Sequence, residues 1–261
     1  MPQPVSSLIL SSHHPIISLI CRSSNNNDRP RQPVRLHSRP RLRPGPPHLH
    51  PAYPPPTTGP IPILVADTPV PNTPLAQRIN AYAKAHLPAP TYNHSLRIYH
   101  FGLAIKRHRF PFPDWDFSDG TYFLSCALHD IGTTEENIQN TRLSFEWVGG
   151  YLALDLLQEK QSDGDAAPRA QAESVAEVII RHQDLCTPYR WQDYCDNTGA
   201  YADLVHPETI KDASEHFPRL KWSNCFTDMI HRENGLKPWA HTTALGEEEF
   251  PAKVLANTLM R

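Results

Sequence analysis

The sequence predicts an all-α protein. From residue 61 onward, apolar side chains recur at spacings of three and four residues, which is the period of one face of an α-helix. Several of these segments begin with a residue type that caps helices. No alternating apolar and polar run bounded by hairpin signals appears, so no β-sheet is expected. We therefore expect one helical bundle, residues 61–261, preceded by a tail, residues 1–60.

The tail has a composition of its own. Residues 1–60 hold 14 of the 28 prolines and seven arginines, against the single acidic residue Asp28. Such a segment buries too little apolar surface to offset its ordering entropy, so we expect it to be disordered. Its prolines also break the amphipathic helix of an organelle import signal, and Pro15 interrupts the apolar stretch near the start. We expect a cytoplasmic protein with no membrane partner.

The predicted helical domain is acidic. The whole chain has a formal charge of −2 and the tail contributes about +6, so the rest carries about −8. This balance predicts no specific nucleic-acid partner. The five cysteines are odd in number and lack a CxxC spacing, which argues against a disulfide framework and against a thiolate zinc site.

Individual residues mark where the helices start. Thr73 followed by Pro74 is typical of an N-cap and a first helical turn, and Asn93 and Ser118 can cap two further helices. The remaining helices are predicted from their apolar spacing. The predicted helices span residues 74–87, 94–108, 119–132, 144–158, 168–183, 206–217 and 218–234.

Three of these helices carry side chains that bind metals. His94 lies in the first turn of one, His129 and Asp130 in the last turn of another, and His182 at the end of a third. Imidazole nitrogens and carboxylate oxygens bind divalent transition metals at about 2.0–2.2 Å, and the helices of a bundle can project such groups inward from different segments. A His-Asp dipeptide alone is weak evidence, so its weight depends on these partners.

The order of these residues, with a later aspartate, resembles the HD-domain superfamily of metal-dependent enzymes, which is all-α. More specific motifs lie between about residue 61 and the C-terminus: TYNHSLRIYHFGLAI, ALHDIGTTEENI, TRLSFEWVGG, QAESVAEVIIRHQDL, LVHPETI and NGLKPWAHTTALGEEEFP. In these motifs the sequence resembles the cyanamide hydratases, which add water to cyanamide to give urea. The resemblance implies one Zn²⁺ per chain, with Fe²⁺ or Mn²⁺ as alternatives, bound by His94, His129, Asp130 and Asp196.

The implied chemistry is physically reasonable. Zinc lowers the pKa of a bound water toward about 7 and so supplies hydroxide to a nitrile carbon at neutral pH. Two neutral imidazoles and two carboxylates balance the metal charge, which suits a small neutral nitrile. His182 is the candidate that orients the substrate or shuttles a proton. Glu136 and Asn137 are candidates to position water or substrate, with a solvated loop as the alternative.

Two other functions stay open. An HD-type nucleotide phosphohydrolase would use the same ligands, but phosphate favours basic neighbours and Glu135 and Glu136 are acidic. An inactive HD module is the second, because only residues 186–195 separate RHQDL from DNTGAY, where the family resemblance predicts a further helix leading into Asp196. Without it we expect Asp196 to lie in a poorly held loop. An error in the gene model would produce the same shortening.

The oligomeric state is not fixed by the sequence. Trp147 lies beside the pair Gly149 and Gly150 in a predicted helix. These residues are compatible with close packing against a partner helix in a homodimer, and equally with packing inside the core. Both interpretations stay open.

Overall fold

The computed structural model describes residues 58–111, 117–162, 164–184 and 195–257. Within these ranges every regular element is helical, which confirms the all-α prediction. The predicted disordered tail lies almost wholly outside the described residues, as does most of the short link before Asp196. The elements are η1 (Val65–Asp67), α2 (Pro74–His86), α3 (Ala89–Arg109), α4 (Asp119–Leu128), η2 (Ile131–Thr133), α5 (Glu135–Gln139), α6 (Phe145–Gln158), α7 (Arg169–Arg181), η3 (Ala202–Leu204), α9 (Pro207–His216), α10 (Trp222–Leu236), η4 (His241–Leu245) and α11 (Glu249–Leu255).

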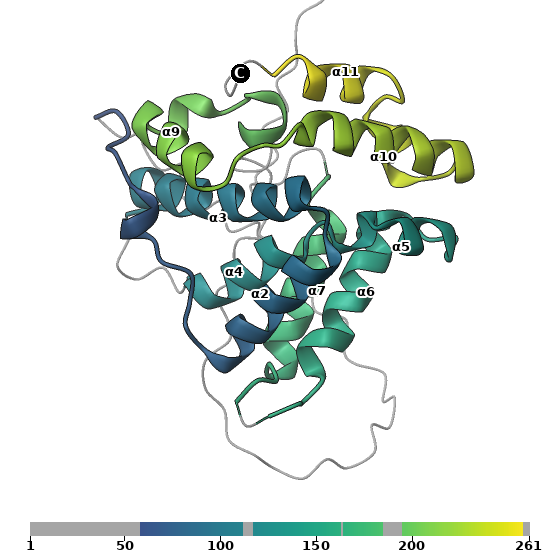
Figure 1. Ribbon diagram of the computed structural model, residues 1–261, viewed down its shortest axis with the longest axis horizontal. Coiled ribbons are helices and arrows are strands. Elements are labelled where there is room, and N and C mark those ends of the chain that lie inside the picture. Colours follow the sequence, from purple (N-terminus) through teal and green to yellow (C-terminus); the bar gives the residue numbers. More distant parts are fainter. Residues whose placement is uncertain (1–57, 112–116, 163, 185–194, 258–261) are drawn as a thin grey trace, which may run out of the picture.

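Helix α3 runs through the middle of the molecule (Figure 1). On one side lie α2, α4, α6 and α7, and on the other lie α9, α10 and α11. A side chain on α3 can therefore meet residues from both groups of helices. Across the described part of the chain, no helix combines the length and the apolar character needed to cross a membrane.

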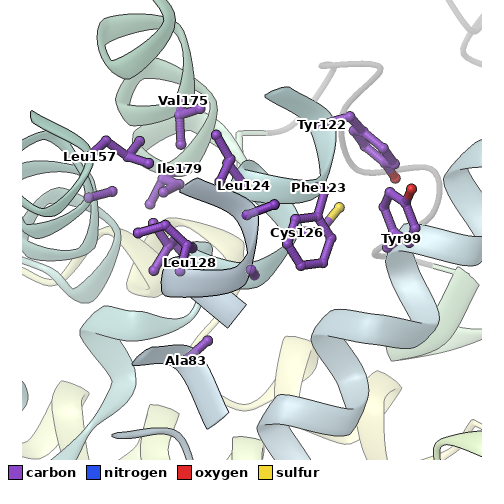
Figure 2. Packing of buried hydrophobic residues seen from close by; sticks show 14 of the residues in the cluster. Ala83, Tyr99, Tyr122, Phe123, Leu124, Cys126, Leu128, Leu157, Val175 and Ile179 are labelled. Carbon is purple, nitrogen blue, oxygen red and sulfur yellow. The ribbon is translucent and has the colours of Figure 1, made fainter. Parts of the chain in front are cut away.

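Helix α4 forms the centre of the largest apolar cluster. All its residues from Thr121 to Leu128 are buried, and a helix buried all round has no polar stripe. Leu124 and Leu128 point toward Leu157, Val175 and Ile179 of α6 and α7 (Figure 2). Removing one such leucine side chain typically costs about 2–5 kcal/mol. This packing fixes the end of α4, where the His-Asp pair follows.

The helix starts confirm two of the three predicted caps. The hydroxyl of Thr73 accepts a hydrogen bond from the amide of Ala76, and that of Ser118 accepts one from Thr121. The prediction for Asn93 is wrong, because α3 already begins at Ala89, with a proline in its first turn. Proline fits there since its missing N–H has no intrahelical acceptor. His94 therefore lies inside α3 instead of at its start.

Glycines allow the backbone of η2 to pack directly on α6. A Cβ atom on Gly132 would lie 2.0 Å from the carbonyl oxygen of Phe145, so only glycine fits. Gly149 and Gly150 are buried against Gly132 and against Ile180 of α7, within the same chain. The structure thus gives this glycine pair a role in core packing, while the homodimer stays a prediction.

Candidate metal centre

Three predicted ligands come together beside the central helix. His94 is fully buried in α3, and His129 and Asp130 follow the last residue of α4. The Nε2 atoms of the two histidines are 3.1 Å apart, and Oδ2 of Asp130 lies 3.2 Å from Nε2 of His129 and 3.8 Å from Nε2 of His94. Among the described residues, this is the group of histidine and acidic side chains whose ligand atoms are close enough to bind a metal ion.

Hydrogen bonds set which ring nitrogen each histidine presents. Nδ1 of His129 lies 2.8 Å from the carbonyl of Cys126, and Nδ1 of His94 lies 2.6 Å from a carboxylate oxygen of Asp196. Both partners only accept hydrogen bonds, so both Nδ1 atoms carry the proton and donate it. In the neutral rings the two Nε2 atoms then face each other with lone pairs. The two lone pairs repel each other, and a cation between them removes this repulsion. The donor set therefore fits a metal ion.

The charge state of Asp130 is also compatible with a bound metal ion. Burial alone would raise the pKa of its carboxyl, but His129, His94 and His182 outweigh burial and hold the pKa at about 2. Neither carboxylate oxygen has a hydrogen-bond partner in the described structure, although both are buried. Buried carboxylates without partners are costly unless they meet a cation. Asp130 is therefore ionised, and its carboxylate is suited to bind a cation.

His182 lies beside the group, directly after the last residue of α7. Its Nδ1 donates a hydrogen bond of 2.6 Å to the carbonyl of Ile179, which leaves Nε2 as the acceptor. Nε2 is buried, lacks a hydrogen-bond partner among the described residues, and lies 3.8 Å from Oδ1 of Asp130. The ring packs against that of Phe145, with centroids 5.6 Å apart and planes inclined by 71°. His182 thus lies next to the predicted metal ligands without belonging to their closely spaced group.

Asp196 lies on the opposite side of His94. Its carboxylate accepts the Nδ1 proton of His94 and forms a two-pronged ion pair with Arg97, with two distances of 2.8 Å. Residues 195–198 are helical and Asp196 is fully buried, so the expectation of a poorly held loop is wrong. Burial raises its pKa, yet Arg97, His94 and Arg219 together lower the pKa well below its usual range. Its role as a fourth ligand stays a prediction.

The remaining two candidates line a cleft that includes Ile131, the residue after Asp130. Glu136 and Asn137 belong to the short helix α5, and the Asn137 side chain donates to the carbonyl of Ile131, 2.8 Å away. The cleft has a volume of about 680 Å³ and also contains Thr133, Cys225, Asp228 and Arg232. Neither candidate belongs to the metal-binding group, so their proposed roles in positioning water or substrate stay predictions.

Two residues of the site were not found by sequence reasoning. Trp222, at the first position of α10, is fully buried and stacks on the ring of His94, with centroids 4.0 Å apart. Arg97, one turn after His94, is also fully buried. A three-residue spacing from a candidate ligand is a usable signal for Arg97, because such residues share a helix face. Trp222 carries no comparable signal.

The chain is 39% identical over 202 residues to two proteins of Saccharomyces cerevisiae, cyanamide hydratase DDI2 and cyanamide hydratase DDI3. Each alignment covers 74% of this chain and 87% of the yeast protein. No family model matches the chain, so the assignment to the HD-domain superfamily stays an expectation. The extent and identity of the alignments show that the chain belongs to the cyanamide hydratase family.

Proposed function

We propose that this protein is a metal-dependent hydratase that adds water to the nitrile group of cyanamide and releases urea. Membership of the cyanamide hydratase family supports the reaction. The observation that carries the metal dependence is the pair of Nε2 atoms 3.1 Å apart, with an ionised carboxylate beside them. Their nitrogen and oxygen donors suit Zn²⁺, and also Fe²⁺ or Mn²⁺.

In this proposal His94, His129 and Asp130 hold the ion. A bound divalent ion supplies a hydroxide nucleophile at neutral pH, because it lowers the pKa of a coordinated water toward about 7. The three side chains contribute one negative charge between them, so a site loaded with a divalent ion keeps a charge of about +1. This positive charge favours the attack of an oxygen nucleophile, during which negative charge develops on the nitrile nitrogen.

His182 would move the proton. Addition of water to the nitrile forms a C–O bond and delivers one proton to the nitrile nitrogen, and the resulting isourea rearranges to urea. Because Nδ1 of His182 donates to a carbonyl, its Nε2 can accept the proton lost by water and pass it to that nitrogen. The position of Nε2 beside Asp130, without a hydrogen-bond partner in the described structure, supports this role.

The charges that line the cleft around Glu136 and Asn137 favour a substrate without negative charge. Its lining carries Glu135, Glu136 and Asp228, and its cation Arg232 is already paired with Glu135. A nucleoside phosphate would meet repulsion here, whereas a neutral nitrile would not.

The test is an assay of the purified chain with two substrates. Cyanamide is expected to yield urea, and a nucleoside monophosphate is expected to yield no phosphate. Metal content is measured on the same sample, then the protein is treated with a chelator and reloaded separately with Zn²⁺, Fe²⁺ and Mn²⁺. His129→Ala should lose metal and turnover, while His216→Ala, on the exposed side of α9, should keep both.

The other outcomes separate the alternatives. Phosphate release without urea would identify a phosphohydrolase. A chain that retains metal but converts neither substrate would overturn the proposed reaction.

A further inference from the structure

We propose that Asp196 acts on the metal centre through His94, as a positioning residue, and stays outside the set of atoms that touch the ion. This inference rests on the proposed metal dependence and assigns how one histidine of the centre is oriented. It differs from the assignment of Asp196 as a fourth ligand. The distinction follows from which atoms of Asp196 are already engaged.

Both carboxylate oxygens of Asp196 have partners on the side away from the ion. Oδ1 lies 2.8 Å from Nε of Arg97 and 3.1 Å from Nη1 of Arg219, and Oδ2 lies 2.8 Å from Nη2 of Arg97 and 2.6 Å from Nδ1 of His94. The carboxylate and the Arg97 side chain are fully buried. Such a two-pronged pair is strong and directional, and breaking it leaves a buried charge without a partner.

The backbone of Asp196 is held as well. Its carbonyl accepts hydrogen bonds of 2.9 Å from Arg219 and 2.8 Å from the side chain of Asn257. The Arg219 guanidinium also lies over the ring of Trp222, which packs on His94. Asp196 therefore cannot turn toward the ion without disrupting several buried contacts at once.

The geometry of imidazole completes the argument. The lone pairs of Nδ1 and Nε2 point away from each other, so a carboxylate that accepts from Nδ1 cannot also reach an ion bound at Nε2. The hydrogen bond to Asp196 instead fixes the His94 ring. It keeps the proton on Nδ1 and the lone pair on Nε2, and it holds Nε2 close to His129. A carboxylate behind a ligating histidine also makes Nε2 a better donor.

The variant Arg97→Lys distinguishes the two roles of Asp196, because they predict different effects on metal affinity. Arg97→Lys keeps a positive charge but gives up the two-pronged contact, so it loosens Asp196. If Asp196 positions His94, metal affinity should fall, by about threefold to tenfold. If Asp196 were a ligand, Arg97 would compete with the metal for its oxygens, and Arg97→Lys should leave the affinity unchanged or raise it.

The experiment combines metal titrations with spectroscopy, and neither depends on turnover. Zn²⁺ and Co²⁺ are titrated into the metal-free full chain, the Arg97→Lys and Asp196→Asn variants, and Asp203→Asn as a control with an exposed aspartate on nearby η3. We expect Asp196→Asn to weaken binding by about 10- to 100-fold. The Co²⁺ absorption bands should keep their positions and intensities, because the coordinating atoms are unchanged. Asp203→Asn should match the unmodified chain.

A second measurement needs no metal. Nitrogen NMR of the histidine-labelled, metal-free chain reports which ring nitrogen is protonated, and the His94 signal is identified by its loss in His94→Gln. We expect the proton on Nδ1 in the unmodified chain. In Asp196→Asn that preference should weaken or reverse, because the amide group can donate to Nδ1.

The results separate this inference from the proposed function. A chain that binds no metal would defeat the metal dependence, and the NMR measurement would still decide whether Asp196 sets the His94 tautomer. Metal binding that is unchanged in Asp196→Asn, a change in the Co²⁺ bands that indicates a lost ligand, or unchanged or tighter binding by Arg97→Lys would each overturn the positioning role.

Discussion

The indole of Trp222 stacks on the imidazole of His94, with ring centroids 4.0 Å apart and planes inclined by 21°. The same indole also stacks on Phe226, within the apolar cluster around α10, with ring centroids 4.9 Å apart. Helix α10 therefore supports His94, a predicted metal ligand that belongs to α3. This contact joins the stability of the domain to the orientation of the site.

Replacing Trp222 tests that support. Trp222→Ala should lower the free energy of unfolding by about 3–5 kcal/mol, because it leaves a cavity at a fully buried position. Trp222→Phe should lose less, since a ring can still stack on His94. Urea denaturation of the metal-free proteins measures both. Trp239→Ala is the control, because this side chain is 56% exposed; an equal loss there would contradict the argument.

Metal binding should stabilise the fold. At a free metal concentration about 1,000 times the dissociation constant, the free energy of unfolding should rise by about 4 kcal/mol. His129→Ala should abolish this rise, because one of the two facing nitrogens is gone. Thermal unfolding with added metal and with chelator measures the difference. A metal-dependent rise that persists in His129→Ala would remove this histidine from the ligand set.

His182 should separate catalysis from metal binding. His182→Ala is expected to keep the metal and to lower kcat by about 10²- to 10⁴-fold, as for loss of a proton-transferring group. His182→Gln keeps a polar side chain of similar reach but cannot transfer a proton, so it should not restore the rate. Metal content and urea formation are measured together. Loss of metal in either variant would make His182 a ligand.

The tail should be dispensable up to a sharp limit. A chain that starts at residue 61 should keep the thermal midpoint and activity of the full chain, because the tail composition predicts disorder. A chain that starts at residue 69 should be less stable. It loses the buried Ile63, whose amide donates to Thr209, and the Val65 amide that donates to Asp212. Equal stability of the two shortened chains would contradict this boundary.

Local signals were enough to predict the helices and part of the site. Apolar periodicity and the caps at Thr73 and Ser118 depend only on residues that are close together in the chain, so both can be recognised in the sequence. Asn93 is a suitable cap by type, yet it lies inside α3 and donates from its side chain to the carbonyl of Pro218, 125 positions away in the chain. Such long-range contacts override local preference.

The same reason explains the surroundings of Asp196. Its type and order suggest a ligand, but its geometry is set by Arg97 on α3 and by Arg219 just before α10. Sequence alone gives the order of these residues and not their side of the His94 ring. The short α5 and α11 were likewise absent from the predicted helices, because five and seven residues show too little periodicity.

A buried carboxyl away from the metal centre should make stability depend on pH. Glu233 is fully buried in α10, where burial and the neighbouring Glu146 raise its pKa from 4.5 to about 7, against the opposing effect of Lys237. The folded chain therefore binds this proton more tightly than the unfolded chain. Its stabilising contribution is complete below about pH 4.5 and is lost as the pH rises through about 7.

Glu233→Gln tests this dependence because the amide does not titrate, while its oxygen can still accept from the Phe145 amide. Relative to the unmodified chain, the variant should gain stability between pH 5 and pH 8, by at most about 3 kcal/mol. Thermal or urea unfolding across that range measures the gain. Glu215→Gln, at an exposed position of α9, should show no such trend. A difference between Glu233→Gln and the unmodified chain that stays constant from pH 5 to pH 8 would show that Glu233 does not titrate in this range.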